Sequence, residues 1–172
     1  HQMLGAAIVH PSQKTVIPLC SEPIVKQDGQ AKNDCEINAA KRFYYKLKED
    51  HPRLKFTILE DALYSTGPNI ELIEKMDWNY IIVVKDRKGD SLGQILEARE
   101  RSLGDINYIS VTEEIGEKVI KKRTHTYRYV NHVPLNYKSN VGTNFLEYRE
   151  VTEWEGKRGP TRNEVHYSWV TN

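Results

Sequence analysis

Residues 54–61 read LKFTILED, a short run rich in apolar and β-branched side chains that ends in two carboxylates. This run predicts a strand from Leu54 to Leu59, with Glu60 and Asp61 at its carboxyl end. Open α/β sheets carry functional groups at the carboxyl ends of their strands, so this end is the first candidate site. Side chains alternate along a strand, and Glu60 and Asp61 are therefore expected to point to opposite faces. Only one of the two is expected to face a common site.

The segments before this strand predict a hairpin followed by a helix. Nearly all residues from Met3 to Val9 are apolar, and a second run from Thr15 to Cys20 follows after a few polar residues, which favours an antiparallel pair. Pro18 indicates an edge or a bulge in the second strand. Residues 33–50 predict a helix with an apolar stripe at helical spacing. The stripe consists of Ile37, Ala40, Tyr44 and Leu47.

The segments after this strand predict further α/β structure and then a β-rich region. Helices are expected over 69–76 and 91–99, and the apolar run from Tyr80 to Val84 predicts a strand covered on both faces. From about Val119 onward polar and apolar residues alternate, which predicts antiparallel strands with a turn at 156–160. The expected fold class is therefore α/β. A mixed sheet with flanking helices is expected over residues 1–118, followed by an antiparallel β-rich region over residues 119–172.

Composition is that of an ordinary folded protein. Hydrophobic residues make up 38% of the 172 residues, and charged residues make up 28% and nearly cancel to a formal net charge of +1. The total charge therefore neither favours nor excludes a polyanionic partner. The two cysteines, Cys20 and Cys35, lack metal-ligand spacing and are expected to be free thiols in a reducing compartment. No stretch of the sequence is typical of a transmembrane helix, so a cytoplasmic protein without a membrane partner is expected.

Several short stretches carry a family resemblance. They are HQMLGA (1–6), KQDG (26–29), KNDCE (32–36), NAAKR (38–42) and EDAL (60–63). Together they resemble the corresponding stretches of bacterial insertion-sequence transposases of the DDE class, and the likeness is strongest before residue 90. The resemblance implies an incomplete ribonuclease-H-like core, in which two Asp and one Glu bind divalent metal ions. It also implies that Asp61 is the second Asp, catalytic and metal-binding, and that residues 119–172 are a β-rich insertion.

The resemblance also implies the reaction and its partners. DNA strand transfer is an in-line displacement at phosphorus, and two cations about 3.5–4 Å apart stabilise the attacking and leaving oxygens. Mg²⁺ or Mn²⁺ is the expected cofactor, because such hard cations prefer carboxylate oxygens and water. The expected partner is DNA, both transposon ends and target, and the intact protein is expected to act as a homodimer.

The sequence departs from the family pattern at the other two carboxylates. The first Asp would precede His1, and the Glu would lie in a signature of Tyr, two residues, Arg, three residues, Glu, six residues and Lys, which no stretch fits. Glu147, Glu150 and Glu153 lie in the alternating β region and are not assigned this role. We therefore expect an internal fragment that alone neither cleaves nor joins DNA.

Basic residues in two places are candidate nucleic-acid contacts. These candidates are Lys85, Arg87, Lys157, Arg158 and Arg162. The first two follow the strand that ends at Val84, and the other three lie around the turn at 156–160. Such clusters supply salt-dependent contacts to phosphates, and the turn from Lys157 to Arg162 is expected to reach the nucleic acid. Basic residues that follow a strand, such as Lys85 and Arg87, are more often only solvated. Trp154 and Trp169 are expected to fill the core of a sheet rather than to stack on bases.

Two further interpretations stay open. One is a catalytically inactive transposase remnant that acts at most as a folded DNA-binding module. The other is a metal nuclease in which Asp61 works with Lys85, although Val83 stands where such a site usually carries an acidic residue. An Asp-bearing strand before His1 and a Glu-bearing helix after Asn172 in the parent gene would favour the transposase. A stop codon or frameshift at either point would favour the remnant.

Overall fold

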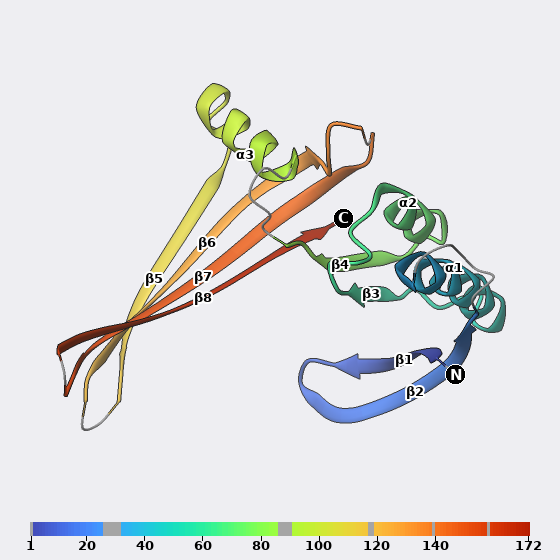
Figure 1. Ribbon diagram of the computed structural model, residues 1–172, viewed down its shortest axis with the longest axis horizontal. Coiled ribbons are helices and arrows are strands. Elements are labelled where there is room, and N and C mark those ends of the chain that lie inside the picture. The colour runs from blue at the N-terminus through green and yellow to red at the C-terminus, as the bar shows by residue number, and fades with distance from the viewer. Residues whose placement is uncertain (1, 26–31, 86–90, 117–118, 139, 158) are drawn as a thin grey trace. The chain divides into compact units, whose positions relative to one another are not determined.

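The computed structural model describes residues 2–25, 32–85, 91–116, 119–138, 140–157 and 159–172. These residues form three helices and two sheets (Figure 1). The hairpin sheet has two strands in the order β1-β2, and the larger sheet has six strands in the order β3-β4-β8-β7-β6-β5. Contacts divide the chain into one unit of residues 1–56 and 71–78 and a second unit of residues 57–70 and 79–172. The expected α/β class with a mixed sheet is therefore confirmed. The mixed sheet is not the one expected over residues 1–118, because the hairpin forms a separate sheet and β8 of the later region pairs with β4.

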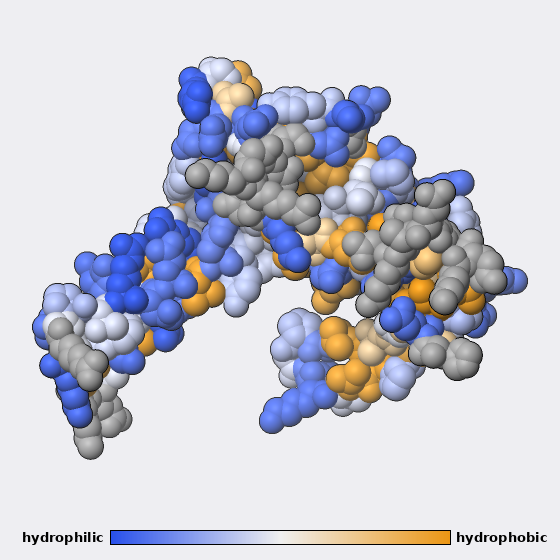
Figure 2. Space-filling view, in the orientation of Figure 1, coloured by the Kyte–Doolittle hydropathy of each residue, from blue (hydrophilic) through white to orange (hydrophobic). Residues whose placement is uncertain are grey.

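The first unit begins with the expected hairpin. Strand β1 (Gln2–His10) pairs antiparallel with β2 (Gln13–Ile24). The register shifts between Gly5 and Ala7, where Ala7 lies opposite Pro18, so the irregularity expected at this proline is confirmed. Apolar side chains lie on the outside of this hairpin (Figure 2).

Helix α1 (Lys32–Asp50) supplies the core of the first unit. Within the predicted stripe Ala40, Tyr44 and Leu47 are buried, and Ile37 is half-buried. An ion pair of 2.7 Å between Arg42 Nε and Glu22 Oε1 joins α1 to β2. The local 3.6-residue periodicity thus predicted both the helix and its buried face.

Trp78 packs against the chain that leads out of α1. Its ring lies edge-on to Tyr44 and Phe56, with centroid distances of 6.1 and 5.3 Å. Its Nε1 donates to the Leu54 carbonyl at 3.3 Å. The expected strand from Leu54 therefore starts later, at Thr57, because the preceding residues pack on and bond to this indole instead of pairing in a sheet.

The second unit is built on the larger sheet. Strands β3 (Thr57–Glu60) and β4 (Asn79–Val83) are parallel, and β4 also pairs antiparallel with the end of β8. The antiparallel strands are β5 (Asn107–Ile115), β6 (Lys121–Pro134), β7 (Gly142–Gly156) and β8 (Gly159–Thr171). The expected turn between the last two strands is confirmed, whereas β5 was not predicted. The larger sheet takes strands from both regions that the sequence suggested.

Two short helices complete the described residues. Helix α2 (Gly67–Lys75) carries Pro68 in its first turn, where a missing N–H costs nothing, and the boundary between the units passes through it. Helix α3 (Ser91–Ser102) contacts β6, and Arg99 near its end donates to the carbonyls of Asn131 and His132. Among the described residues no helix is long and apolar enough to cross a bilayer.

The burial of strand β4 differs from the prediction. Tyr80 and Ile82 are fully buried, but Ile81 between them is 41% exposed, and its neighbour Leu59 on β3 is 59% exposed. The prediction of a strand covered on both faces was therefore wrong. Side chains alternate across a strand, and within the described part of the chain only one of the two faces is covered.

Candidate metal-binding site at the end of strand β3

Asp61 lies directly beyond the carboxyl end of β3 and is exposed. Its Oδ1 accepts a hydrogen bond of 2.8 Å from the Leu63 N–H, which is the pattern of an Asx turn. Among the described residues Oδ2 has no hydrogen-bond partner. The turn therefore fixes the carboxylate at the rim of the sheet and leaves one oxygen for a further ligand.

Glu60 faces the other way and has a structural role. Its Oε2 accepts a hydrogen bond of 2.7 Å from Asn69 Nδ2, and the same amide group donates to the Tyr64 carbonyl at 3.2 Å. Asn69 is 1% exposed and lies in the first turn of α2. The expected alternation thus separates a carboxylate that holds the β3–α2 connection from one that is open to solvent.

Lys85 lies at the same end of the larger sheet as Asp61, the end at which β3 and β4 both terminate. Because β3 and β4 are parallel, with Glu60 opposite Ile82 as the last pair, their carboxyl ends meet there. Val84 bonds to Ser168 on β8 through its N–H at 2.9 Å and its carbonyl at 3.0 Å, and exposed Lys85 follows. Arg87, the other candidate after this strand, lies outside the described residues.

The chemistry of Asp61 fits a hard divalent cation as one ligand. Carboxylate oxygens are what Mg²⁺ prefers, with waters completing the shell. Within the described ranges no group of three or more His, Cys, Asp or Glu side chains is arranged to hold a metal ion. Within the part of the chain that the structure describes, Asp61 is thus a single ligand at this end of the sheet and not part of a carboxylate cluster.

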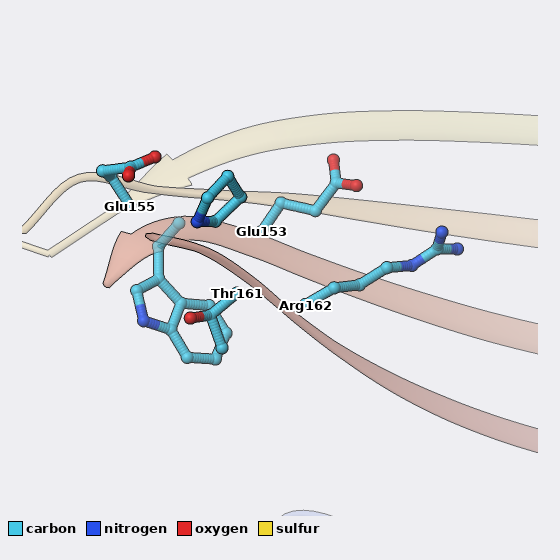
Figure 3. A pocket seen from close by; sticks show the side chains of 6 residues that line it. Glu153, Glu155, Thr161 and Arg162 are labelled. Atoms are coloured by element: carbon cyan, nitrogen blue, oxygen red, sulfur yellow. The ribbon is translucent and has the colours of Figure 1, made fainter. Parts of the chain in front are cut away.

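A second candidate surface lies at the hairpin between β7 and β8. An open pocket of about 350 Å³ there is lined by Glu153, Trp154, Glu155, Pro160, Thr161 and Arg162. Figure 3 shows the side chains of Glu153 and Arg162 side by side on adjacent strands, where they are paired in register. Arg162 also donates to Glu164 Oε2 at 3.1 Å. Arg162 is therefore paired with the carboxylate of Glu164.

The other residues of this hairpin differ in their surroundings. Lys157 is exposed at the turn, whereas Arg158 lies outside the described residues. Glu164 also accepts a hydrogen bond of 2.6 Å from Arg149 Nε, and this bond holds the pKa of the Glu164 carboxyl below its usual value. Of the candidate basic residues here, exposed Lys157 is therefore better placed than Arg162 to meet a phosphate.

Neither Trp154 nor Trp169 fills a core. Both are half-buried; Lys121 Nζ lies 4.8 Å from the centroid of the Trp154 ring, and Trp169 stacks on Tyr167 with centroids 5.8 Å apart. The core prediction was wrong because no second layer covers this face of the sheet in the described residues. A sequence pattern shows which side chains share a face, but not whether another layer packs on it.

The same face carries an aromatic row that sequence reasoning missed. Tyr127, Tyr148 and Tyr167 are neighbours in register on three adjacent strands. Tyr148 Oη donates to Glu150 Oε2 at 2.9 Å and lies 2.8 Å from His125 Nδ1. Desolvation, with help from Glu150, raises the pKa of Tyr148 to about 12. Alternating tyrosines were visible in the sequence, but only the strand register brings them into one row.

Lys85 also lines a small cavity of about 180 Å³ between α3 and the sheet. In its wall Glu147 Oε2 lies 3.3 Å from Arg128 Nη1, and Glu147 Oε1 lies 3.2 Å from His166 Nε2. Glu147 is thus paired with both of these side chains.

Comparison of the sequence with models of known protein families gave no match, and neither did comparison with curated proteins.

Proposed function

We propose that this chain is part of a DDE transposase that cleaves and joins DNA during transposition of an insertion sequence. Asp61 supplies one of the carboxylates that bind Mg²⁺ or Mn²⁺. The observation that carries the proposal is an exposed carboxylate directly beyond β3, at the end of the sheet where its parallel neighbour β4 also terminates. Open α/β sheets place reacting groups at such ends, and the resemblance reaches the same residues through the stretch EDAL.

The surroundings of Asp61 support a role for segments beyond this sequence. Asp61 follows β3 directly, and Leu59 within β3 is paired in register with Ile81 of β4. Both apolar side chains are exposed. A Glu-bearing helix such as the resemblance implies after Asn172 could bury them by packing on this face of the sheet, which would contribute roughly 1.5–3 kcal/mol for the two side chains together, because each is already about half covered.

The bound cations would stabilise the attacking and leaving oxygens at phosphorus. This chain's own residues would hold the metal at Asp61 and contact the DNA backbone. Lys85 lies at the same end of the sheet, and Lys157 is exposed on the β7–β8 turn. Arg162 would contribute less, because it already donates to Glu164. The proposed partners are transposon-end and target DNA.

A second candidate function is a metal nuclease that pairs Asp61 with Lys85. The parallel pairing of β3 and β4 favours the nuclease, because it places both residues at the same end of the sheet. The apolar, half-buried Val83 stands against it, since this is the place of a second acidic ligand. The transposase therefore ranks first, with an inactive remnant that only binds DNA as its non-catalytic counterpart.

Metal binding at Asp61 is tested with Mn²⁺ as a paramagnetic probe in NMR spectra of the chain. We expect selective broadening of the amide signals of residues 61–63, lost in Asp61→Asn. Asparagine keeps the oxygen that accepts from Leu63, so the turn persists and only the negative charge is removed. Asp50→Asn, at the exposed end of α1, is the matched control and should leave the broadening unchanged. Equal broadening in wild type and Asp61→Asn would show that Asp61 does not bind the ion.

A further inference from the structure

Strand β5 is an outer edge of the larger sheet (Figure 1). It pairs only with β6, through an unbroken register from Asn107 opposite Tyr129 to Ile115 opposite Lys121. In an antiparallel pair, alternate residues direct their N–H and C=O groups away from the partner strand. On its outer side β5 therefore presents a row of backbone groups that have no partner strand within the described residues.

This edge lacks most of the features that usually prevent pairing with another chain. Proteins blunt exposed edges with short strands, bulges, proline or charged side chains, especially Lys. Strand β5 has nine residues, no register shift, no proline and no Lys or Arg, and its two charged residues, Glu113 and Glu114, lie near its end. Its apolar residues Ile109 and Val111 are 49% and 54% exposed. A long, regular and partly apolar edge of this kind is suited to strand addition.

We infer that β5 pairs antiparallel with β5 of a second copy of this chain across a two-fold axis. The first half of the strand is uncharged, and Glu113 and Glu114 lie near its end. Antiparallel pairing sets the acidic end of each copy beside the uncharged start of the other, whereas parallel pairing would place like charges together. Such an interface is isologous and closes at two copies, so it does not propagate.

The charge of the edge favours a second copy over DNA. Both charged side chains of β5 are acidic, and a phosphate backbone would be repelled. Glu113 Oε1 lies 3.5 Å from Arg123 Nη1 and 3.3 Å from His125 Nε2 of its own chain. These neighbours on β6 lessen the cost of bringing that carboxylate near another protein strand. The dimer would form whether or not the chain belongs to a transposase.

Sedimentation velocity of the purified chain, without DNA or metal, tests the dimer. We expect a concentration-dependent dimer in wild type, and in Val111→Lys a dissociation constant raised by about tenfold or more, because a charged side chain at the edge disfavours pairing. Ile120→Lys is the matched control, since Ile120 is 56% exposed but lies outside the strand. Ile109→Lys should act like Val111→Lys. A monomeric wild type, or dimers equally strong in both edge variants, would overturn the inference.

Hydrogen exchange gives a readout that does not depend on the variants folding. The outward-directed amides among residues 109–113, which alternate along the strand, should gain protection in wild type as protein concentration rises, because they become bonded to the second copy. Amides of the inner strand β7 should not change with concentration. Exchange in β5 that is independent of concentration would also overturn the dimer.

Discussion

Glu60 and Asp61 have the same charge and adjacent positions, but their surroundings give the two carboxylates different hydrogen-bond partners and different exposure. Alternation along β3 turns Glu60 toward Asn69 and leaves Asp61 at the rim, where Leu63 occupies one of its oxygens. This difference was predictable from the sequence, because strand periodicity depends only on the local chain. The Asx turn at Asp61 was not predicted, and it means that an alanine variant would remove a turn as well as a metal ligand. Asparagine is therefore the informative substitution.

Tyr148 offers a prediction about pH. Its pKa is raised from 10.0 to about 12, first by desolvation and then by the hydrogen bond to Glu150. A raised folded-state pKa means that this tyrosine contributes stability that is complete below about pH 10 and is lost as the pH rises through about 12. We expect the free energy of unfolding to fall more steeply over this range in wild type than in Tyr148→Phe, as measured by urea denaturation at each pH.

Glu150→Gln checks the cause of that shift. Removing the carboxylate removes the acceptor charge that favours the neutral phenol, so the pKa of Tyr148 should move down toward its ordinary value. The ionisation can be followed by ultraviolet absorbance, with Tyr148→Phe identifying the signal. A steep loss of stability that is the same in wild type and Tyr148→Phe would exclude Tyr148 as its source.

At the scale of the elements, local patterns predicted most of the structure. The hairpin, α1 and the strands β3 and β4 follow from apolar periodicity, and the starts of helices and strands differ by a few residues. Strand β5 was missed, and its burial explains why: nearly all of its residues are exposed, so no buried face imposes a clear pattern. The exposure of Ile81 and Trp169 was missed for a related reason. Burial depends on which layers cover a strand, and that information is not local.

Trp78 joins α1 to the segment before β3, so its removal should affect the whole first unit. Trp78→Ala deletes a side chain that is 1% exposed and packs on Tyr44 and Phe56, and we expect a loss of about 3–5 kcal/mol in the free energy of unfolding. Trp78→Phe should lose less, because a ring remains while the bond to the Leu54 carbonyl is lost. Urea denaturation measures both.

Leu103→Ala is the control for that series. Leu103 is 67% exposed, directly after α3, and its truncation should change the free energy of unfolding by no more than about 0.5 kcal/mol. If Trp78→Ala were no more destabilising than Leu103→Ala, Trp78 would not hold the first unit together.

At the scale of the whole molecule, the two edges of the larger sheet differ in what they offer. Strand β5 is long and regular and suits pairing with a second copy, whereas β3 has only four residues and ends at Asp61. A short edge strand is less suited than β5 to pairing with a second copy. The sequence indicated Asp61 and Lys85 at one end of the sheet, and the parallel register of β3 and β4 brings them there.

The proposed reaction predicts that this chain alone is inactive on DNA. A two-metal displacement needs several carboxylates converging on one point, and the described residues contain no group of three or more potential ligands. The purified chain should therefore leave supercoiled plasmid intact with Mg²⁺ or Mn²⁺, whereas a longer gene product with the additional Asp and Glu should cut transposon-end DNA and lose that activity in Asp61→Asn. Metal-dependent nicking by the chain itself, abolished in Asp61→Asn but retained in Asp50→Asn, would contradict the requirement for further carboxylates and favour the nuclease in which Lys85 assists Asp61.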